Sequence, residues 1–153
     1  MKTATLQAVK AYDTLKSLKV SDLSEEAMYA LWHDIKTLRP IAEEYGKQRD
    51  EVLATLHDSS FDEMQKRLQV AKEREEKVNK GEYAMTEADI KDVQEINQWY
   101  ADFNGKADKY FTEMGAKEVD IDAKPIAEAE LLKALRACGK SFADMEELGW
   151  LTE

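Results

Sequence analysis

Proline, glycine and cysteine are scarce in this chain of 153 residues, and each shortage excludes a class of protein. Two prolines and six glycines leave few places for a flexible linker, so one domain is expected over residues 1–153. The lone Cys138 cannot form an internal disulfide, which suits a reducing compartment. No apolar run approaches the roughly 20 residues that a membrane span requires. These absences predict one soluble domain in the cytoplasm.

Basic residues are also in deficit, because 22 Lys and Arg stand against 32 Asp and Glu and the net charge is -10. Nucleic acids and anionic membranes bind clustered Lys and Arg, so this balance argues against both as direct partners. A protein partner, basic or neutral, fits better. Apolar residues still make up 43% of the chain, which is enough for a hydrophobic core.

Sequence motifs of catalytic, metal-binding and phosphate-binding sites are missing as well. The sequence has no HExxH, no CxxC, no glycine-rich phosphate loop and no nucleophile elbow. His33 and His57 would lie about 36 Å apart on one helix, so they cannot share a metal ion. Asp120 and Asp122 project from the same side of an extended segment, but no calcium-binding loop follows them. We therefore predict no enzyme, no cofactor and no metal.

Apolar residues recur at steps of three and four along two long segments. The first segment follows a predicted N-cap at Ser24 and runs from Glu25 to His57. Pro40 lies inside it and removes a backbone donor. Because the heptad phase continues across Pro40, a kinked single helix is favoured, and two helices are the alternative.

The second segment contains the stretch VQEINQWYADFNGKADKYFTEM. It begins at a predicted capping box of Thr86 and Asp89, and a left-handed stop is expected at Gly115. We expect the two seams to pair as antiparallel helices with coiled-coil spacing. A third helix would cover the wider apolar face that three aromatic residues provide: Trp32, Trp99 and Phe111.

Shorter segments complete the predicted bundle. A first helix carries Leu6, Val9, Tyr12, Leu15 and Leu18 on one face. Residues 59–82 form a charged, marginal helix that a capping box of Ser60 and Glu63 begins and Gly81 ends.

The last part of the chain is expected to mix a strand with short helices. The run EVDID alternates apolar and acidic residues, which indicates a short ribbon beside Leu18–Val20. A helix over 126–138 and a final capped turn at Ser141 and Asp144 follow. The predicted fold class is all-α: an elongated helical bundle on two long antiparallel helices, with a two-stranded ribbon at one end.

Two features suggest how such a protein would bind a partner. The tail 141–153 contains Glu146 and Glu147 before Trp150 and Leu151, the composition of a docking peptide, although the last two could equally pack on their own bundle. The second long helix also carries carboxylates outside its seam. They are Glu87, Asp89, Asp92, Glu95, Asp102, Asp108 and Glu113.

The order of these segments resembles a known group of proteins. A short helix, an LKV turn, the long helix AMYALWHDIKTLRPIAEEYGKQRDEVL, a later helix followed by EVDI, and AELLKAL are together similar to a family of small uncharacterised helical proteins of tailed bacteriophages and prophages. The similarity covers Ala4–Leu56 and Ile96–Leu135. It implies a bacterial host cytoplasm and an accessory, assembly or anti-host role, and it transfers no catalytic residue.

The sequence therefore predicts a non-enzymatic protein–protein interaction or assembly protein that binds a phage or host protein. Candidate contact residues are Trp150, Leu151, Glu146, Glu147, Asp102 and Asp108. The alternative is an acidic inhibitor that mimics DNA and blocks a host nucleic-acid-binding defence protein. A homo-oligomer that completes its core across a twofold axis is also open.

Overall fold

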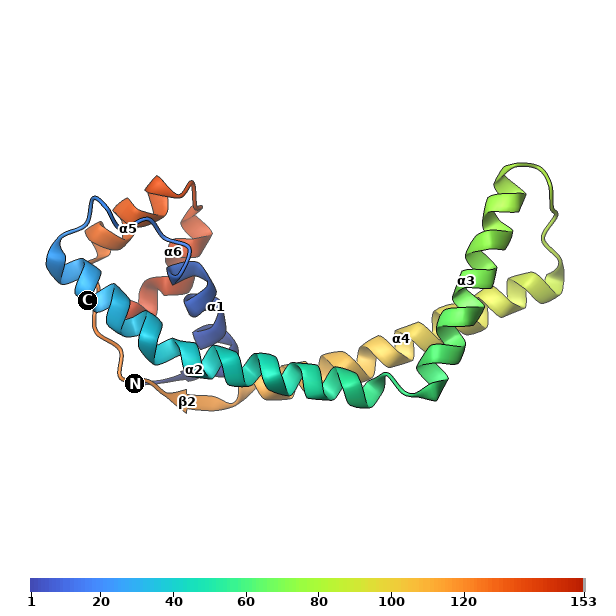
Figure 1. Cartoon of the computed structure of the whole chain (residues 1–153), viewed down its shortest axis with the longest axis horizontal. Helices are drawn as coiled ribbons and strands as arrows, with labels where there is room; N and C mark the ends of the chain where they lie inside the picture. Colours follow the sequence, from blue (N-terminus) through green and yellow to red (C-terminus); the bar gives the residue numbers. More distant parts are fainter. Residues whose placement is uncertain (153) are drawn as a thin grey trace. The chain divides into compact units, whose positions relative to one another are not determined.

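The computed structural model describes residues 1–152 and contains mostly α-helix (Figure 1). Two helices are long, α2 with 32 residues and α4 with 30. Together with four shorter helices and one small two-stranded sheet, they confirm the predicted all-α class. The elements are β1 (Lys2–Ala4), α1 (Thr5–Leu15), α2 (Glu25–Leu56), α3 (Ser59–Asn79), α4 (Glu87–Ala116), β2 (Glu118–Asp120), α5 (Glu128–Ala137), α6 (Phe142–Leu148) and the 3-10 turn η1 (Gly149–Leu151).

The chain forms two compact units. Unit 1 contains Met1–Gln48 and the segment that starts at Thr112, and unit 2 contains Arg49–Phe111. The boundary falls inside α2 and α4, so both connections between the units are continuous helix. Because no Gly- or Pro-rich linker is needed for such a connection, composition could not reveal the division.

Sequence signals at helix ends were largely correct. The Ser24 side chain accepts a hydrogen bond from the Ala27 backbone N–H at 3.2 Å, as an N-cap does. Helix α2 then continues through Pro40, which confirms the single-helix interpretation. At α3 the cap is Asp58, whose carboxylate accepts from the Phe61 backbone N–H at 3.1 Å. The Ser60 and Glu63 capping box was therefore wrong, because Asp58 caps the helix two residues earlier.

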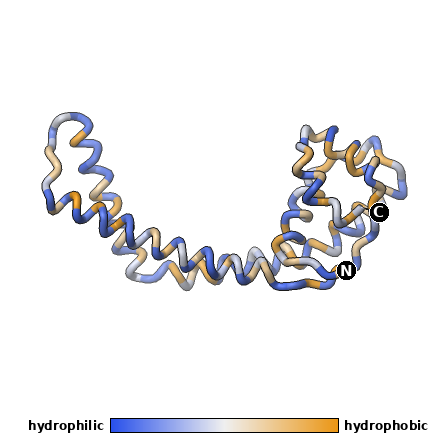
Figure 2. Tube along the Cα trace, turned by 180° about the vertical axis from the view of Figure 1, so that it is seen from behind, coloured by the Kyte–Doolittle hydropathy of each residue, from blue (hydrophilic) through white to orange (hydrophobic). Residues whose placement is uncertain are grey.

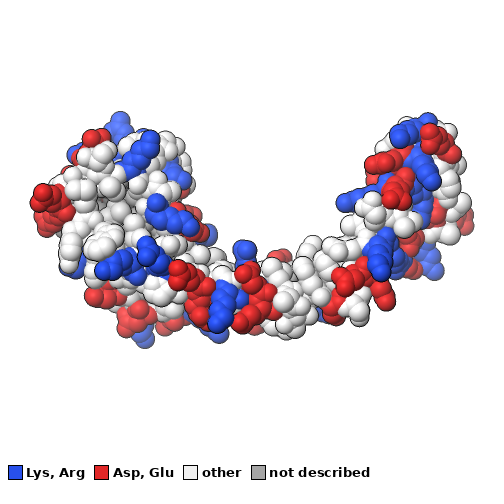
Figure 3. All heavy atoms as spheres, viewed as in Figure 1, with Lys and Arg blue, Asp and Glu red and all other residues white. Residues whose placement is uncertain are grey.

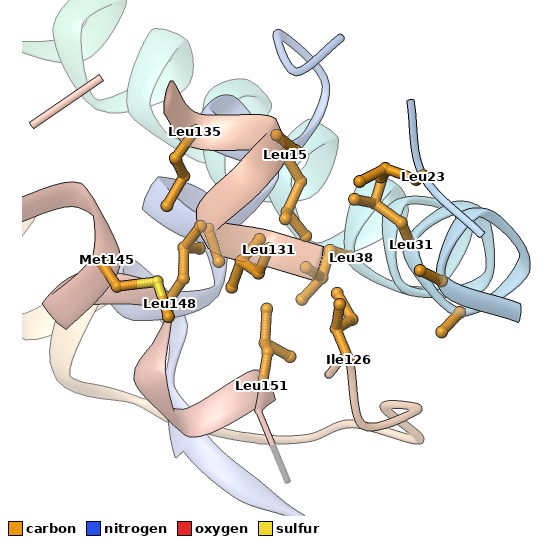
Figure 4. Close-up of a cluster of buried hydrophobic side chains, with 14 of the residues drawn as sticks. Leu15, Leu23, Leu31, Leu38, Ile126, Leu131, Leu135, Met145, Leu148 and Leu151 are labelled. Carbon is orange, nitrogen blue, oxygen red and sulfur yellow. The ribbon is translucent and has the colours of Figure 1, made fainter. Parts of the chain in front are cut away.

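Unit 1 holds a continuous hydrophobic core built from α1, the first half of α2, α5, α6 and the loops between them (Figure 4). Sixteen buried apolar residues belong to this cluster, and none of them comes from α4. The first half of the α2 seam therefore belongs to a cluster that does not include α4. The first half of α2 packs Leu31 and Leu38 against α1, α5 and α6 instead, because those helices present their own apolar faces there.

Helix α1 buries a different face from the predicted one. Its buried positions are Thr5, Ala8, Ala11 and Leu15. Leu6 remains exposed, and its side chain lies beside Gly115 of α4. A Cβ added to Gly115 would be 3.0 Å from the Leu6 Cβ. Gly115 therefore provides space for a close contact, and it is not the left-handed stop that was expected. The glycines with positive φ within residues 1–152 are Gly81, which ends α3 as predicted, and Gly139.

The short ribbon exists, but its partner strand differs from the expected one. Strand β2 pairs antiparallel with β1, with Thr3 opposite Val119. The Met1 ammonium donates to Asp120 Oδ1 at 3.0 Å and so ties the first residue to the same ribbon. Leu18 and Val20 pack on the unit 1 core instead. Alternation in EVDID indicated a strand, but it carried no information about which segment would pair with it.

Unit 2 is a helical hairpin extended by the last turns of α2. Helix α3 and the part of α4 up to Phe111 form the α3–α4 hairpin, residues 59–111. Figure 2 shows hydrophobic and hydrophilic residues alternating along the tube of both helices. No residue of α3 is buried. The buried apolar side chains of the unit are Ile96 and Ala107. Helix α3 is therefore partly exposed, as predicted.

Candidate interaction surfaces

The α3–α4 hairpin leaves a groove of about 450 Å³ between its helices. We call it the hairpin groove; it is lined by Leu68, Ala71, Lys72, Glu75, Val78, Met85, Val93, Ile96 and Asn97. Its walls are mainly aliphatic, and its polar residues are Lys72 and Glu75 on α3 and Asn97 on α4. Ile90 on α4 is 48% exposed. An apolar groove with a polar rim is the form that receives an amphipathic helix.

Ion pairs between α3 and α4 hold the two walls of this groove in place. Arg74 Nη1 lies 3.1 Å from Asp89 Oδ1, and both side chains are largely buried. Arg67 Nη2 contacts Asp92 and lies 3.0 Å from Glu95 Oε2. The Arg67 contacts are charge-assisted hydrogen bonds between the two helices. Arg74 contributes an ion pair, since its Nη1 has no hydrogen-bond partner within residues 1–152.

The start of α4 is fixed by a local network that the sequence predicted. The Asp89 backbone N–H donates to Thr86 Oγ1 at 3.2 Å, and Asp89 Oδ2 accepts from the Thr86 backbone N–H at 3.0 Å. Asp89 Oδ2 also accepts from the Tyr83 hydroxyl at 2.6 Å, and this hydrogen bond is the main reason that the pKa of Asp89 is lowered. The capping box of Thr86 and Asp89 is confirmed.

These contacts change the interpretation of the carboxylates on α4. Asp89, Asp92 and Glu95 face the two arginines of α3 and are engaged within the hairpin. Asp102 and Asp108 remain exposed, and the Asp102 carboxylate accepts a hydrogen bond from Gln98 at 3.0 Å. Basic and acidic side chains are mixed on the face of the hairpin that Figure 3 shows. Part of the row of carboxylates expected on α4 is therefore neutralised by arginines of α3.

The C-terminal candidates lie mostly within unit 1. Leu151 is 1% exposed and belongs to the core (Figure 4). Trp150 packs against that core. The Leu151 carbonyl accepts from the Ile126 backbone N–H at 2.9 Å. Of the two alternatives for the tail, the structure shows internal packing. Glu146 and Glu147 stay on the surface, and Glu147 lies 3.9 Å from Lys10 Nζ.

Unit 1 also carries a buried carboxyl group that sequence reasoning missed. Asp34 on α2 is completely buried, its Oδ1 accepts from the Lys124 backbone N–H at 2.7 Å, and its Oδ2 has no hydrogen-bond partner within residues 1–152. Burial raises the pKa of Asp34 to about 6, and the hydrogen bond from Lys124 opposes this shift. The neighbouring His33 Nε2 lies 2.8 Å from the Asp122 carbonyl oxygen. Asp34 and His33 together hold the segment 122–124 against α2.

No group of three or more potential metal ligands occurs within residues 1–152. Asp120 interacts with the first residue of the chain, and Asp122 lies beside His33. His57 stacks on Phe61 with ring centroids 4.0 Å apart. No helix in the described part of the chain is long and apolar enough to cross a membrane.

The fold and these surfaces define an all-α protein with an unfilled groove in a helical hairpin. No protein-family model, curated protein or solved structure matches the chain. Its function is therefore inferred from its own surfaces.

Proposed function

We propose that this chain is a non-enzymatic interaction protein whose α3–α4 hairpin binds an amphipathic helix of another protein. The observation that carries the proposal is the hairpin groove, with Leu68, Val78 and Val93 among its walls. A partner helix that placed apolar side chains at steps of three and four in the groove would remove these walls from water. The rim residues Lys72 and Glu75 would fix its orientation.

The small core of unit 2 supports the same proposal. An isolated pair of helices gains too little from helix propensity alone to be stable in water, and most of its stability comes from burying apolar faces. Unit 2 buries Ile96 and Ala107 of α4 and leaves every apolar side chain of α3 half-buried or exposed. A third helix in the groove would supply the missing burial, and binding would therefore stabilise the hairpin.

The context proposed for this activity is a tailed phage or prophage, supported by the resemblance over Ala4–Leu56 and Ile96–Leu135. The DNA-mimicking inhibitor is the weaker proposal, because Asp89, Asp92 and Glu95 are engaged with α3 arginines. The two proposals differ in their salt dependence. Binding by an acidic mimic should weaken steeply as salt rises, whereas binding in an apolar groove should change little.

A groove-filling substitution tests the proposal directly. Ala71 lines the groove, so Ala71→Leu should fill part of it, raise the melting temperature slightly and exclude the partner helix. Ala101→Leu makes the same chemical change at an exposed position of α4 and serves as the control. Tagged wild type and both variants would be used to capture proteins from a bacterial lysate, with elution in steps of increasing salt.

The proposal requires one protein that binds the wild type and Ala101→Leu but not Ala71→Leu, and that remains bound as salt is raised. Equal capture by all three proteins would contradict a role for the groove. Light scattering on the same samples identifies the remaining case: a dimer that Ala71→Leu dissociates would mean that the helix comes from a second copy of the chain.

A further inference from the structure

The exposed face of the first half of α2 carries two aromatic side chains that the core does not use. Tyr29 is 56% exposed and Trp32 is 57% exposed. They are three residues apart on one helix and therefore lie on the same face. Trp32 was expected to widen a buried seam, and its exposure corrects that prediction. Exposed Trp and Tyr are the residues that most often dominate protein–protein binding energies.

A lysine ammonium lies over each of these rings. Lys36 Nζ is 4.3 Å from the Trp32 ring centroid, and Lys124 Nζ is 4.4 Å from the Tyr29 ring centroid. Neither lysine forms an ion pair with a carboxylate within residues 1–152. Each positive charge is therefore placed beside an apolar surface and remains available to an anion.

The position of Lys124 depends on contacts far from it in sequence. Its backbone N–H donates to the buried Asp34 at 2.7 Å, and the Asp122 carbonyl oxygen lies 2.8 Å from His33 Nε2. The segment 122–124 is thus attached to α2 at two points. This attachment brings the Lys124 side chain to the ring of Tyr29 and creates a surface that neither segment has alone.

The charge of this surface differs from that of the whole chain. We call Tyr29, Trp32, Lys36 and Lys124 the aromatic–lysine face. Arg39 is exposed one turn beyond Lys36 on the same side of α2. Asp122 also lies nearby, but its carboxylate is beside His33, with Oδ2 3.8 Å from His33 Nε2. Glu25 and Glu26 are exposed one turn before Tyr29, so the positive charge is confined to the part of the face that Lys36, Lys124 and Arg39 surround. On a chain of net charge -10, such a confined positive charge selects an anionic partner that is small enough to contact it alone.

From this geometry we infer that the aromatic–lysine face binds an acidic peptide segment of another protein, one that carries carboxylates beside a large apolar side chain. The apolar side chain contacts Tyr29 and Trp32, and the carboxylates pair with Lys36 and Lys124. Single-stranded nucleic acid also stacks on aromatic rings. A nucleic acid carries many phosphates, which the acidic chain would repel, and the face offers only a few cations to pair with them. A short peptide has only two or three carboxylates to pair. The peptide is therefore the better match.

This face belongs to unit 1 and does not include any residue of the hairpin groove. The inference therefore stands or fails independently of the proposed function. Ala71→Leu should leave peptide binding unchanged, and loss of the aromatic–lysine face should leave binding in the hairpin groove unchanged.

A display selection with random dodecapeptides tests the inference on the full chain. The targets are the wild type, the double variant Trp32→Ala/Lys36→Gln and the matched control Phe142→Ala/Lys140→Gln. The control removes another exposed aromatic side chain, 76% exposed, together with an exposed lysine of unit 1. Circular dichroism melting curves establish that all three proteins are folded.

We expect the wild type and the control to select the same peptides, with at least two Asp or Glu beside Leu, Phe or Trp. Affinity for the selected peptides should fall about tenfold or more in the double variant, measured by fluorescence anisotropy. Three results would each overturn the inference: no enrichment, enrichment of basic peptides, or equal affinity in the double variant. A labelled dodecathymidylate that bound more tightly than every selected peptide would also overturn it, in favour of nucleic acid.

Discussion

The two units of this molecule contain similar amounts of helix but differ in how many apolar side chains they bury. Unit 1 gathers sixteen buried apolar residues into one cluster, whereas the buried apolar side chains of unit 2 are Ile96 and Ala107. Both contain amphipathic helices, and α3 is more hydrophilic than the helices of unit 1. The difference is how many neighbouring elements cover each apolar face. Unit 1 has helices from both ends of the chain for this purpose, while the hairpin has one helix opposite another.

This difference indicates where stability and binding are located. Apolar burial is the dominant favourable contribution to folding, so unit 1 should provide most of the free energy of unfolding. The hairpin is held by ion pairs and caps at its surface, and it keeps apolar groove walls accessible. A region with few buried contacts is also a region that opens locally at low cost.

The largest expected effect is the loss of a core side chain in unit 1. Leu38 is completely buried, so Leu38→Ala should lower the free energy of unfolding by about 2–5 kcal/mol. Leu68→Ala, at a half-buried groove position in unit 2, should cost about 1 kcal/mol. Urea unfolding monitored by circular dichroism measures both variants. Similar costs at the two positions would mean that the units are equally well packed.

The next effect is a pH dependence in unit 1. Burial raises the pKa of Asp34 from 3.8 to about 6, so the folded chain binds this proton more tightly than the unfolded chain does. The stability contributed by the protonated group is fully present below about pH 4 and is lost as pH rises through about 6. Asp34→Asn should remove this loss, roughly 1–3 kcal/mol by the size of the shift.

The difference in melting temperature between wild type and Asp34→Asn separates the contribution of Asp34 from those of the other carboxyl groups. Asp120 and Asp144 have lowered pKa values, caused mainly by the Met1 ammonium group and by the Ser141 backbone N–H, respectively. Their contributions to stability are lost as pH falls, which is opposite to the pH dependence of Asp34. Melting curves from pH 4 to 8 provide the measurement. A constant difference between the two proteins across this range would show that Asp34 does not titrate there.

The smallest effect concerns the cap at the start of α4. Thr86→Ala removes the hydroxyl that accepts the Asp89 backbone N–H and should cost about 1 kcal/mol. If unit 2 opens separately from unit 1, hydrogen exchange should accelerate near residues 87–95 while α1 and α5 remain unchanged. Faster exchange in both units would show instead that they unfold together.

Local signals in the sequence were sufficient for much of the fold. Ser24 marked the start of α2, and the box of Thr86 and Asp89 marked the start of α4, because a cap depends on residues three apart. The partner of β2 and the buried face of α1 were not predictable in the same way. The core uses Ala8 and Ala11 on that face, and small residues at close helix contacts are invisible to a search for large apolar side chains.

The candidate sites show the same limit. The spacing of Leu68, Ala71 and Val78 is typical of an apolar stripe, but only the structure shows that this stripe lines an open groove. The contact between the Lys36 ammonium and the Trp32 ring could have been predicted from their spacing of four residues, but Trp32 was assigned to a buried face. Lys124 joins this face through contacts 90 residues apart in sequence with Asp34, and no local pattern reports them.

Hydrogen exchange across α2 and α4 tests the central claim most directly, because each helix passes through both units and provides its own reference. The account predicts that amides of α3 and residues 87–111 exchange about 100-fold faster or more, after correction for intrinsic rates, than those of α1, α5 and residues 26–45 of α2. Equal protection along the whole of α2 and α4 would contradict it, because the hairpin would then be as well buried as unit 1.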